Sequence, residues 1–114
     1  MARVMTGEGG YRVLIRMEIE PGAGPRFELA WGEMSAIARR HPASRGQSLS
    51  RVADEPDVYY IVTDWADEAG FADFTASAGH AEGGRKLKEL RRGGSRTPMV
   101  VVQRVPGHLV PSAP

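Results

Sequence analysis

The chain has 114 residues and a formal net charge of +1, so it suits one domain and carries no field that favours nucleic acid or a membrane surface. It has no cysteine, which excludes disulfides, thiol catalysis and cysteine-ligated metals. No segment approaches the ~20 apolar residues of a membrane span, and the first residues lack a signal-peptide run. We therefore expect a cytoplasmic protein with no nucleic-acid or membrane partner.

The first forty residues predict a strand and a helix. Residues 11–19 (YRVLIRMEI) alternate as a strand whose odd-numbered residues face the core. Pro25 suits the first helical position, where its missing N–H costs no hydrogen bond, and the helix runs to about Arg40. The apolar stripe of this helix consists of Phe27, Trp31, Met34 and Ile37/Ala38.

A hairpin follows the first helix. Residues 46–53 form a weaker strand with polar alternation, and residues 54–57 (DEPD) make a tight reversal. Residues 58–63 (VYYIVT) are β-branched and aromatic, which is typical of a buried strand.

Two helical segments and a last strand complete the pattern. Asp67 suits a helix N-cap, and Gly79 is expected to interrupt the helix that follows. Residues 93–95 (GGS) are expected to end the next helix as a left-handed cap. Residues 96–105 then form the last strand, with Pro98 at its entry.

The element order β-α-β-β-α-β is that of the ferredoxin-like α+β fold, a four-stranded antiparallel sheet with helices on one face. We expect this domain over residues 11–105, with residues 1–10 and 106–114 as flexible termini. The other sheet face would expose Leu14 and valines of the third strand, and Arg16 on that face would need a partner. A homodimer joined sheet to sheet is the expected remedy.

Three stretches carry a resemblance to a known family: VLIRMEIEPGAGPRFELAW, DVYYIVTDWADEAGFADF and SAGHAEGGRKLKEL. They resemble the antibiotic biosynthesis monooxygenase family, and the likeness extends over residues 11–105. The resemblance implies a dimeric α+β barrel of the type found in bacterial aromatic polyketide pathways. Members include oxygenases that need no metal or flavin and that turn hydroxy-aromatic intermediates into quinones, while relatives degrade haem or cyclise polyketides.

Three positions depart from the pattern of that family. Ile15 stands where several members have an asparagine on the first strand, and Phe74 stands where they have a tryptophan. Gly84 occupies the place of the haem-ligand histidine, with His80 about one turn earlier. These departures argue against haem.

Cofactor-free oxygenation needs a flat apolar slot, exclusion of water and a base near the acidic position of the substrate. His80 is the predicted base, since the ordinary pKa of histidine lies near 6.5. Either Tyr59 or Tyr60 could hold a substrate oxygen, and Tyr60 is the second predicted catalytic residue. The predicted substrate-binding residues are Ile15, Trp31, Met34, Tyr59, Trp65, Phe71 and Phe74.

A purely structural interpretation stands beside each of these assignments. Aromatic stripes are most often plain core, and His80 could simply be a hydrogen-bonded or helix-capping histidine. His41, beside Pro42, is expected to be solvated, and His108 lies in the tail. Three scattered histidines without cysteine predict no metal site.

The sequence therefore predicts a cofactor-independent monooxygenase that uses molecular oxygen to oxidise a polycyclic hydroxy-aromatic polyketide intermediate to a quinone. Two alternatives remain open: a non-redox polyketide cyclase or aromatase on the same fold, and a non-catalytic ligand-binding or auxiliary subunit. Oxygen uptake separates the first function from the other two, and tight product binding without turnover marks the last.

Overall fold

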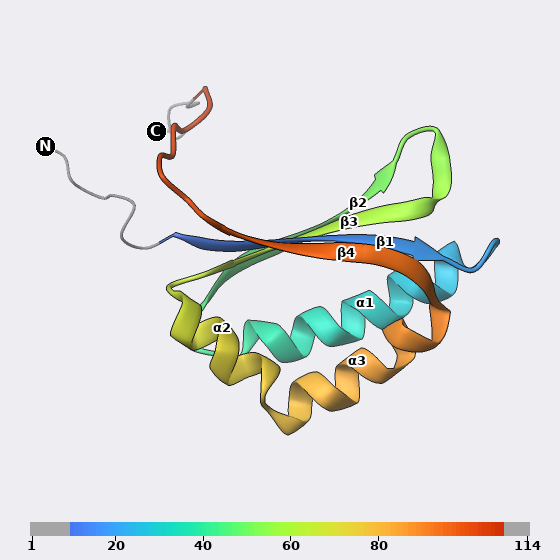
Figure 1. Cartoon of the computed structure of the whole chain (residues 1–114), viewed down its shortest axis with the longest axis horizontal. Helices are drawn as coiled ribbons and strands as arrows, with labels where there is room; N and C mark the ends of the chain where they lie inside the picture. Colours follow the sequence, from blue (N-terminus) through green and yellow to red (C-terminus); the bar gives the residue numbers. More distant parts are fainter. Residues whose placement is uncertain (1–9, 109–114) are drawn as a thin grey trace, which may run out of the picture.

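The computed structural model describes residues 10–108, and the flexible termini predicted at residues 1–10 and 106–114 lie mostly outside that range. Within it, four strands form one antiparallel sheet and three helices cover one face of the sheet (Figure 1). The elements in chain order are β1 (Tyr11–Ile19), α1 (Gly24–Arg39), β2 (Ser44–Val52), β3 (Glu55–Trp65), α2 (Glu68–Thr75), α3 (Ala78–Leu90) and β4 (Arg91–Val100). This confirms the ferredoxin-like prediction, with two consecutive helices, α2 and α3, in the second half.

The sheet has the strand order β2-β3-β1-β4, so β1 and β3 are its inner strands. Ile15 lies opposite Ile61 of β3 on one side and opposite Arg96 of β4 on the other. The odd-numbered residues of β1 face the helices. Val13 and Met17 are buried on that face, as the alternation predicts.

The main core lies between the sheet and α1. Pro25 occupies the first turn of α1, and Phe27 is fully buried with its ring centroid 4.8 Å from that of Tyr59. α3 packs closely on α1 because glycines of α3 face α1. A Cβ on Gly83 would lie 2.7 Å from Met34 Sδ of α1. The buried members of this core are Met17, Ile19, Ala23, Phe27, Ala30, Tyr59, Ile61 and Leu87.

The break between α2 and α3 lies earlier than predicted. Asp67 caps α2 as expected, since its Oδ1 accepts from Gly70 N at 2.8 Å. The predicted interruption at Gly79 is wrong, because Ser77 is the N-cap of α3 and accepts from His80 N at 3.1 Å. Gly79 lies inside the first turn, where a Cβ would stand 2.9 Å from Ile37 Cγ2. The glycine allows close helix contact and does not end a helix.

The last strand also begins earlier than predicted. Residues 93–95 do not cap a helix; they lie within β4, which starts directly at Arg91. Gly94 has φ +144°, and a Cβ there would stand 1.9 Å from Arg16 O of β1. β4 therefore needs glycine at this position because β1 lies so close. Pro98 lies inside β4 and not at its entry, which an edge strand tolerates.

The hairpin is tighter than predicted. The predicted reversal at residues 54–57 is replaced by a turn at Ala53 and Asp54, and β3 already begins at Glu55. β2 begins at Ser44, two residues before the expected start. The tip of the hairpin rises on the side of the sheet away from the helices (Figure 1).

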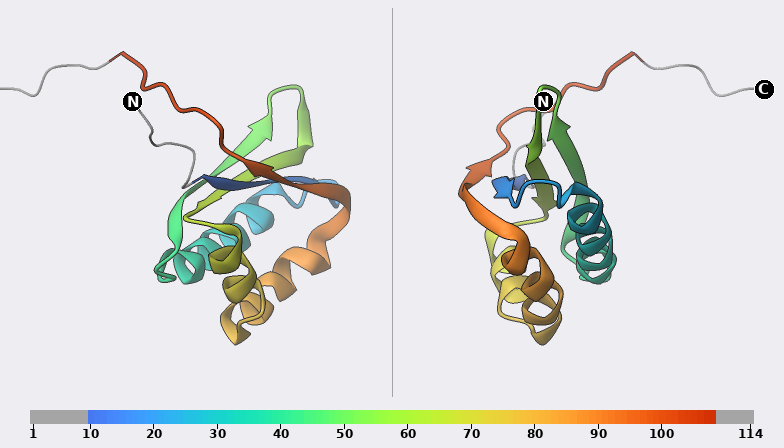
Figure 2. Two further views of the ribbon diagram at one scale, coloured as in Figure 1. Left: turned by 60° about the vertical axis from the view of Figure 1, so that its left-hand side comes forward. Right: turned by 90° about the vertical axis from the view of Figure 1, so that its right-hand side faces the viewer.

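The other face of the sheet carries no helix among the described residues (Figure 2). Arg12 Nε and Nη2 donate to the two carboxylate oxygens of Asp64 on this face, at 2.6 and 3.0 Å. Arg16 lies over the Tyr60 ring, 6.0 Å from its centroid, and its Nη1 atom is buried 3.3 Å from Glu18 Oε2 without a hydrogen bond to any described group. No helix within residues 10–108 is long and apolar enough to cross a membrane.

Candidate functional site

Aromatic rings gather where β3 ends, under α2 and the start of α3. The Trp65 and Phe74 rings are stacked, with centroids 5.2 Å apart and planes 28° apart. Both residues are buried, and the indole Nε1 donates to Thr63 Oγ1 at 2.9 Å. Phe71 packs on Trp65 at 5.6 Å. The rings of Trp65, Phe71 and Phe74 together form an aromatic wall, and its indole N–H is already satisfied within the protein.

His80 stands at the rim of this wall. It is the third residue of α3, and its ring meets the Phe74 ring edge-on with centroids 5.3 Å apart. Burial, and then the positive charges of Lys88 and Arg96, lower the pKa of His80 below its ordinary 6.5. A half-buried imidazole that is neutral at neutral pH can accept a proton, which is the property required of the predicted base.

Arg96 adds a cation beside the same rim. It projects from β4 toward the helices, and its guanidinium lies 5.6 Å from the centroid of the Phe71 ring. Phe71 also packs on Tyr11 at 5.7 Å. Half-exposed Phe71 and His80 and exposed Arg96 therefore border a surface where a flat, acidic aromatic molecule could lie.

A second histidine belongs to this cluster. The expectation that His41 is solvated is wrong, because its side chain is only 16% exposed. Its ring meets Trp65 and Phe74 edge-on, at 5.9 and 6.2 Å. Its Nε2 lies 2.7 Å from Asp73 Oδ2. Sequence reasoning missed the pair since its members are 32 positions apart and no local motif joins them.

The two tyrosines lie on opposite faces of the sheet. Tyr59 is buried under α1, and its hydroxyl donates to Glu28 Oε2 at 2.6 Å. Burial and that bond raise the pKa of Tyr59 above its ordinary 10, so it stays protonated. Tyr60 points to the helix-free face against Arg16, so the structure separates it from His80, its predicted catalytic companion.

The remaining predicted binding residues divide between two clusters. Ile15, Trp31 and Met34 pack half-buried against the main core. Met34 also contacts the cluster that contains Trp65 and Phe74. The structure therefore brings Trp65, Phe71, Phe74 and His80 together. Ile15, Trp31 and Met34 instead pack against the main core.

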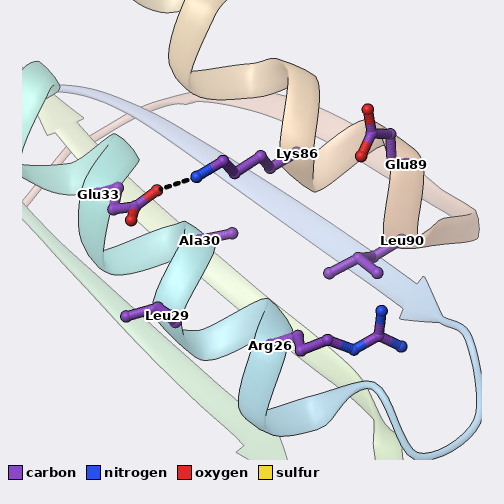
Figure 3. Close-up of a pocket in the computed structure, with 7 residues that line it drawn as sticks. All are labelled: Arg26, Leu29, Ala30, Glu33, Lys86, Glu89 and Leu90. Carbon is purple, nitrogen blue, oxygen red and sulfur yellow. Dashed lines mark hydrogen bonds and ion pairs between the residues drawn. The ribbon is translucent and has the colours of Figure 1, made fainter.

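A separate groove lies between α1 and α3 (Figure 3). Its volume is about 240 Å³, and Lys86 Nζ donates across it to Glu33 Oε1 at 3.0 Å. Its lining residues are Arg26, Leu29, Ala30, Glu33, Lys86, Glu89 and Leu90. None of these is a predicted site residue, and four of the seven are charged. This groove is thus a poor slot for a polycyclic ring.

Among residues 10–108 no group of three or more histidine, aspartate or glutamate side chains is arranged to hold a metal ion.

Solved structures of the same fold are similar over almost their whole length. SnoaB, a cofactor-independent oxygenase from Streptomyces nogalater, has a TM-score of 0.80 in a variant form and is 21% identical, covering 87% of this chain and 99% of SnoaB. A candidate antibiotic biosynthesis monooxygenase from Bordetella bronchiseptica has a TM-score of 0.75 and 22% identity, over 83% of this chain and 99% of its own. A similar candidate from Caulobacter crescentus has a TM-score of 0.76 and 16% identity, over 84% and 92%.

At these identities the structural likeness establishes the fold alone. No curated protein matches the chain. The sequence profile of the antibiotic biosynthesis monooxygenase family matches residues 10–86, more than half of the chain. This chain therefore belongs to the antibiotic biosynthesis monooxygenase family.

Proposed function

We propose that this protein is a cofactor-independent monooxygenase that oxidises a polycyclic hydroxy-aromatic polyketide intermediate to a quinone. The observation that carries the proposal is the neutral, half-buried His80 imidazole held edge-on to Phe74, at the rim of the Trp65–Phe74 stack. The likeness to SnoaB, which is described as a cofactor-independent oxygenase, supports the same chemistry.

The reaction needs only a base, an aromatic wall and oxygen. His80 takes the acidic C–H proton of an anthrone-like substrate, and the resulting carbanion gives one electron to O₂. The carbon radical and superoxide combine to a peroxide, which takes up the proton and loses water to leave a ketone. One O₂ is consumed, one quinone and one water form, and neither metal nor flavin enters the balance.

The wall and the cation supply orientation. A planar substrate lies against the half-exposed Phe71 ring beside His80, and Arg96 stabilises the oxyanion that forms when the proton leaves. Tyr60 has no part in this scheme, since it lies on the far face of the sheet.

We further propose that the protein is a homodimer joined through the helix-free face. Apolar Leu14, Val58 and Val62 lie on that face beside the unsatisfied Nη1 of Arg16, and burial by a second copy would cover them. A two-fold axis would bring the same surface of both copies together, with each contact between two different residues occurring twice.

The test is oxygen uptake with 1,8-dihydroxyanthrone as the probe, with quinone formation followed by absorbance. The wild type should consume oxygen above the rate of spontaneous oxidation, and His80→Gln should lower kcat by ~10²–10⁴. His108→Gln, at an exposed histidine far along the chain, is the matched control and should keep the wild-type rate.

Equal turnover by the wild type and by His80→Gln would contradict the assignment of the base. Ring closure of a poly-β-ketone without oxygen uptake would favour the cyclase alternative. Tight anthraquinone binding without turnover would favour the auxiliary-subunit alternative.

A further inference from the structure

We propose that His41 and Asp73 form a positioning pair that holds the aromatic wall in the orientation needed to bind a flat ring. The inference rests on the proposed function for the role of the wall, but not for the existence of the pair. His41 Nε2 lies 2.7 Å from Asp73 Oδ2, and the pair joins the turn after α1 to the exposed face of α2.

Both ring nitrogens of His41 are engaged. Ala43 N donates to Nδ1 at 3.0 Å, so Nδ1 is an acceptor and the ring proton lies on Nε2, which donates to Asp73. With one bond on each side, the imidazole cannot rotate without losing a partner. The ring plane of His41 is therefore determined by the backbone on one side and by α2 on the other.

The backbone around His41 is equally constrained. His41 N donates to Ala38 O, and its own carbonyl accepts from Ser44 N, both at 3.0 Å. Ala66 N donates to Ala43 O at 2.8 Å, which ties the same turn to the residue after β3. The pair thus links the turn after α1 to α2, and the Ala66–Ala43 bond links the same turn to the end of β3.

The His41 ring contacts two of the three rings that form the wall, those of Trp65 and Phe74. It meets Trp65 at 5.9 Å and Phe74 at 6.2 Å, in both cases edge-on. Phe74 also meets His80 at 5.3 Å, so it lies between the two histidines. A shift of Phe74 caused by loss of the pair would change both the wall and the surroundings of the proposed base.

Pairs of hydrogen-bonded surface side chains are common and often have only a structural role. The test must therefore measure a property of the aromatic wall itself. Asp73 is 78% exposed, and a hydrogen bond between the neutral imidazole and a carboxylate so close to solvent contributes little to stability. The proposed role of the pair is to orient the aromatic wall. Loss of the pair should therefore change ligand affinity while the protein stays folded.

The experiment measures the accessibility of Trp65 and the affinity for an anthraquinone probe. The chain has two tryptophans, so Trp31→Phe leaves Trp65 as the one fluorophore. In that background Asp73→Ala should increase acrylamide quenching of Trp65 and weaken probe binding by about 10-fold. Asp73→Asn retains an acceptor oxygen for Nε2–H and should restore both values. His41→Phe retains a ring but no hydrogen bond, and should behave like Asp73→Ala.

The matched control is Glu82→Ala, which removes the partner of Arg85 in an exposed pair on α3. It should leave quenching and affinity at the parent values, and circular dichroism should show every variant folded. Unchanged Trp65 quenching and probe affinity in Asp73→Ala would overturn the inference. Altered quenching and affinity in a protein that never consumes oxygen would support the pair while contradicting the proposed oxygenase, so the two failures are distinguishable.

Discussion

The proposed base depends on two nearby positive charges as well as on burial. Lys88 and Arg96 both lower the pKa of His80. Activity that requires the neutral imidazole should rise with pH through a midpoint below 6.5. Lys88→Gln removes one charge, so it should move the midpoint of kcat/KM toward higher pH. Lys86→Gln, on the same helix but paired with Glu33, is the control and should leave it unchanged. Equal midpoints in all three proteins would contradict this electrostatic account.

The same pKa shift predicts how stability depends on pH. Since the folded-state pKa of His80 is lowered, the unfolded chain takes up a proton first as pH falls past about 6.5. The free energy of unfolding should therefore fall as the pH is lowered from about 7 through 6.5. His80→Gln should flatten this part of the curve, measured by urea unfolding at several pH values, whereas His108→Gln should not. A wild-type curve that is flat over this window, or unchanged by His80→Gln, would contradict the shift.

Residue-level roles were predictable only where they depend on local sequence. The concentration of Trp65, Phe71 and Phe74 near His80 follows from a strand end meeting a helix, and the structure brings them together. Predicting which of Tyr59 and Tyr60 faces the helices requires the strand register, and predicting the partner of His41 requires the packing of α2. Neither can be predicted from nearby residues.

Among the elements, β4 depends on a glycine that touches its neighbour. Gly94 and Gly46 have similar backbone angles, φ +144° and +140°, but a Cβ on Gly46 would meet nothing within 4 Å. Gly46→Ala should therefore cost only the backbone strain, about 1–3 kcal/mol. Gly94→Ala adds the clash with Arg16 O and should cost clearly more, measured by chemical unfolding. Equal losses would show that the clash is relieved by movement of β4.

The N-cap of α3 provides a test of where the boundary between α2 and α3 lies. Ser77→Ala removes the oxygen that accepts from His80 N and should cost about 1 kcal/mol of unfolding free energy. The same change at Ser50, an exposed strand residue, is the control and should stay within about 0.5 kcal/mol. A Ser77→Ala loss no larger than that of the control would argue against the cap. Sequence favoured Gly79 as the break because glycine is a poor helix former; close packing on Ile37 explains its presence inside α3.

At the scale of the whole molecule, element order was readable from the sequence because alternation in β1, Pro25 and Asp67 are local signals. The start of β4 was not, since residues 93–95 favour a cap locally and only contact with β1 makes them a strand. The helix-free face likewise follows from the alternation, whereas the proposed second copy lies outside a single chain.

The proposed homodimer gives a prediction at this scale. Sedimentation at micromolar concentration should give twice the chain mass, and Val62→Glu, in the middle of the helix-free face, should give the monomer. Leu29→Glu changes an exposed leucine on α1 instead and should leave the dimer intact. A wild-type protein that stays monomeric at tens of micromolar would contradict the proposal.

The central claim is that this protein transfers an oxygen atom from O₂ to the methylene carbon of an anthrone-like polycyclic substrate without a cofactor. The most direct measurement is turnover of 1,8-dihydroxyanthrone under ¹⁸O₂ with a metal chelator present and no flavin, followed by mass spectrometry of the product. The account predicts one O₂ consumed per quinone and one ¹⁸O atom in the quinone, formed faster than in the protein-free control. Product formation no faster than in that control, or a product whose new oxygen comes from water, would contradict it.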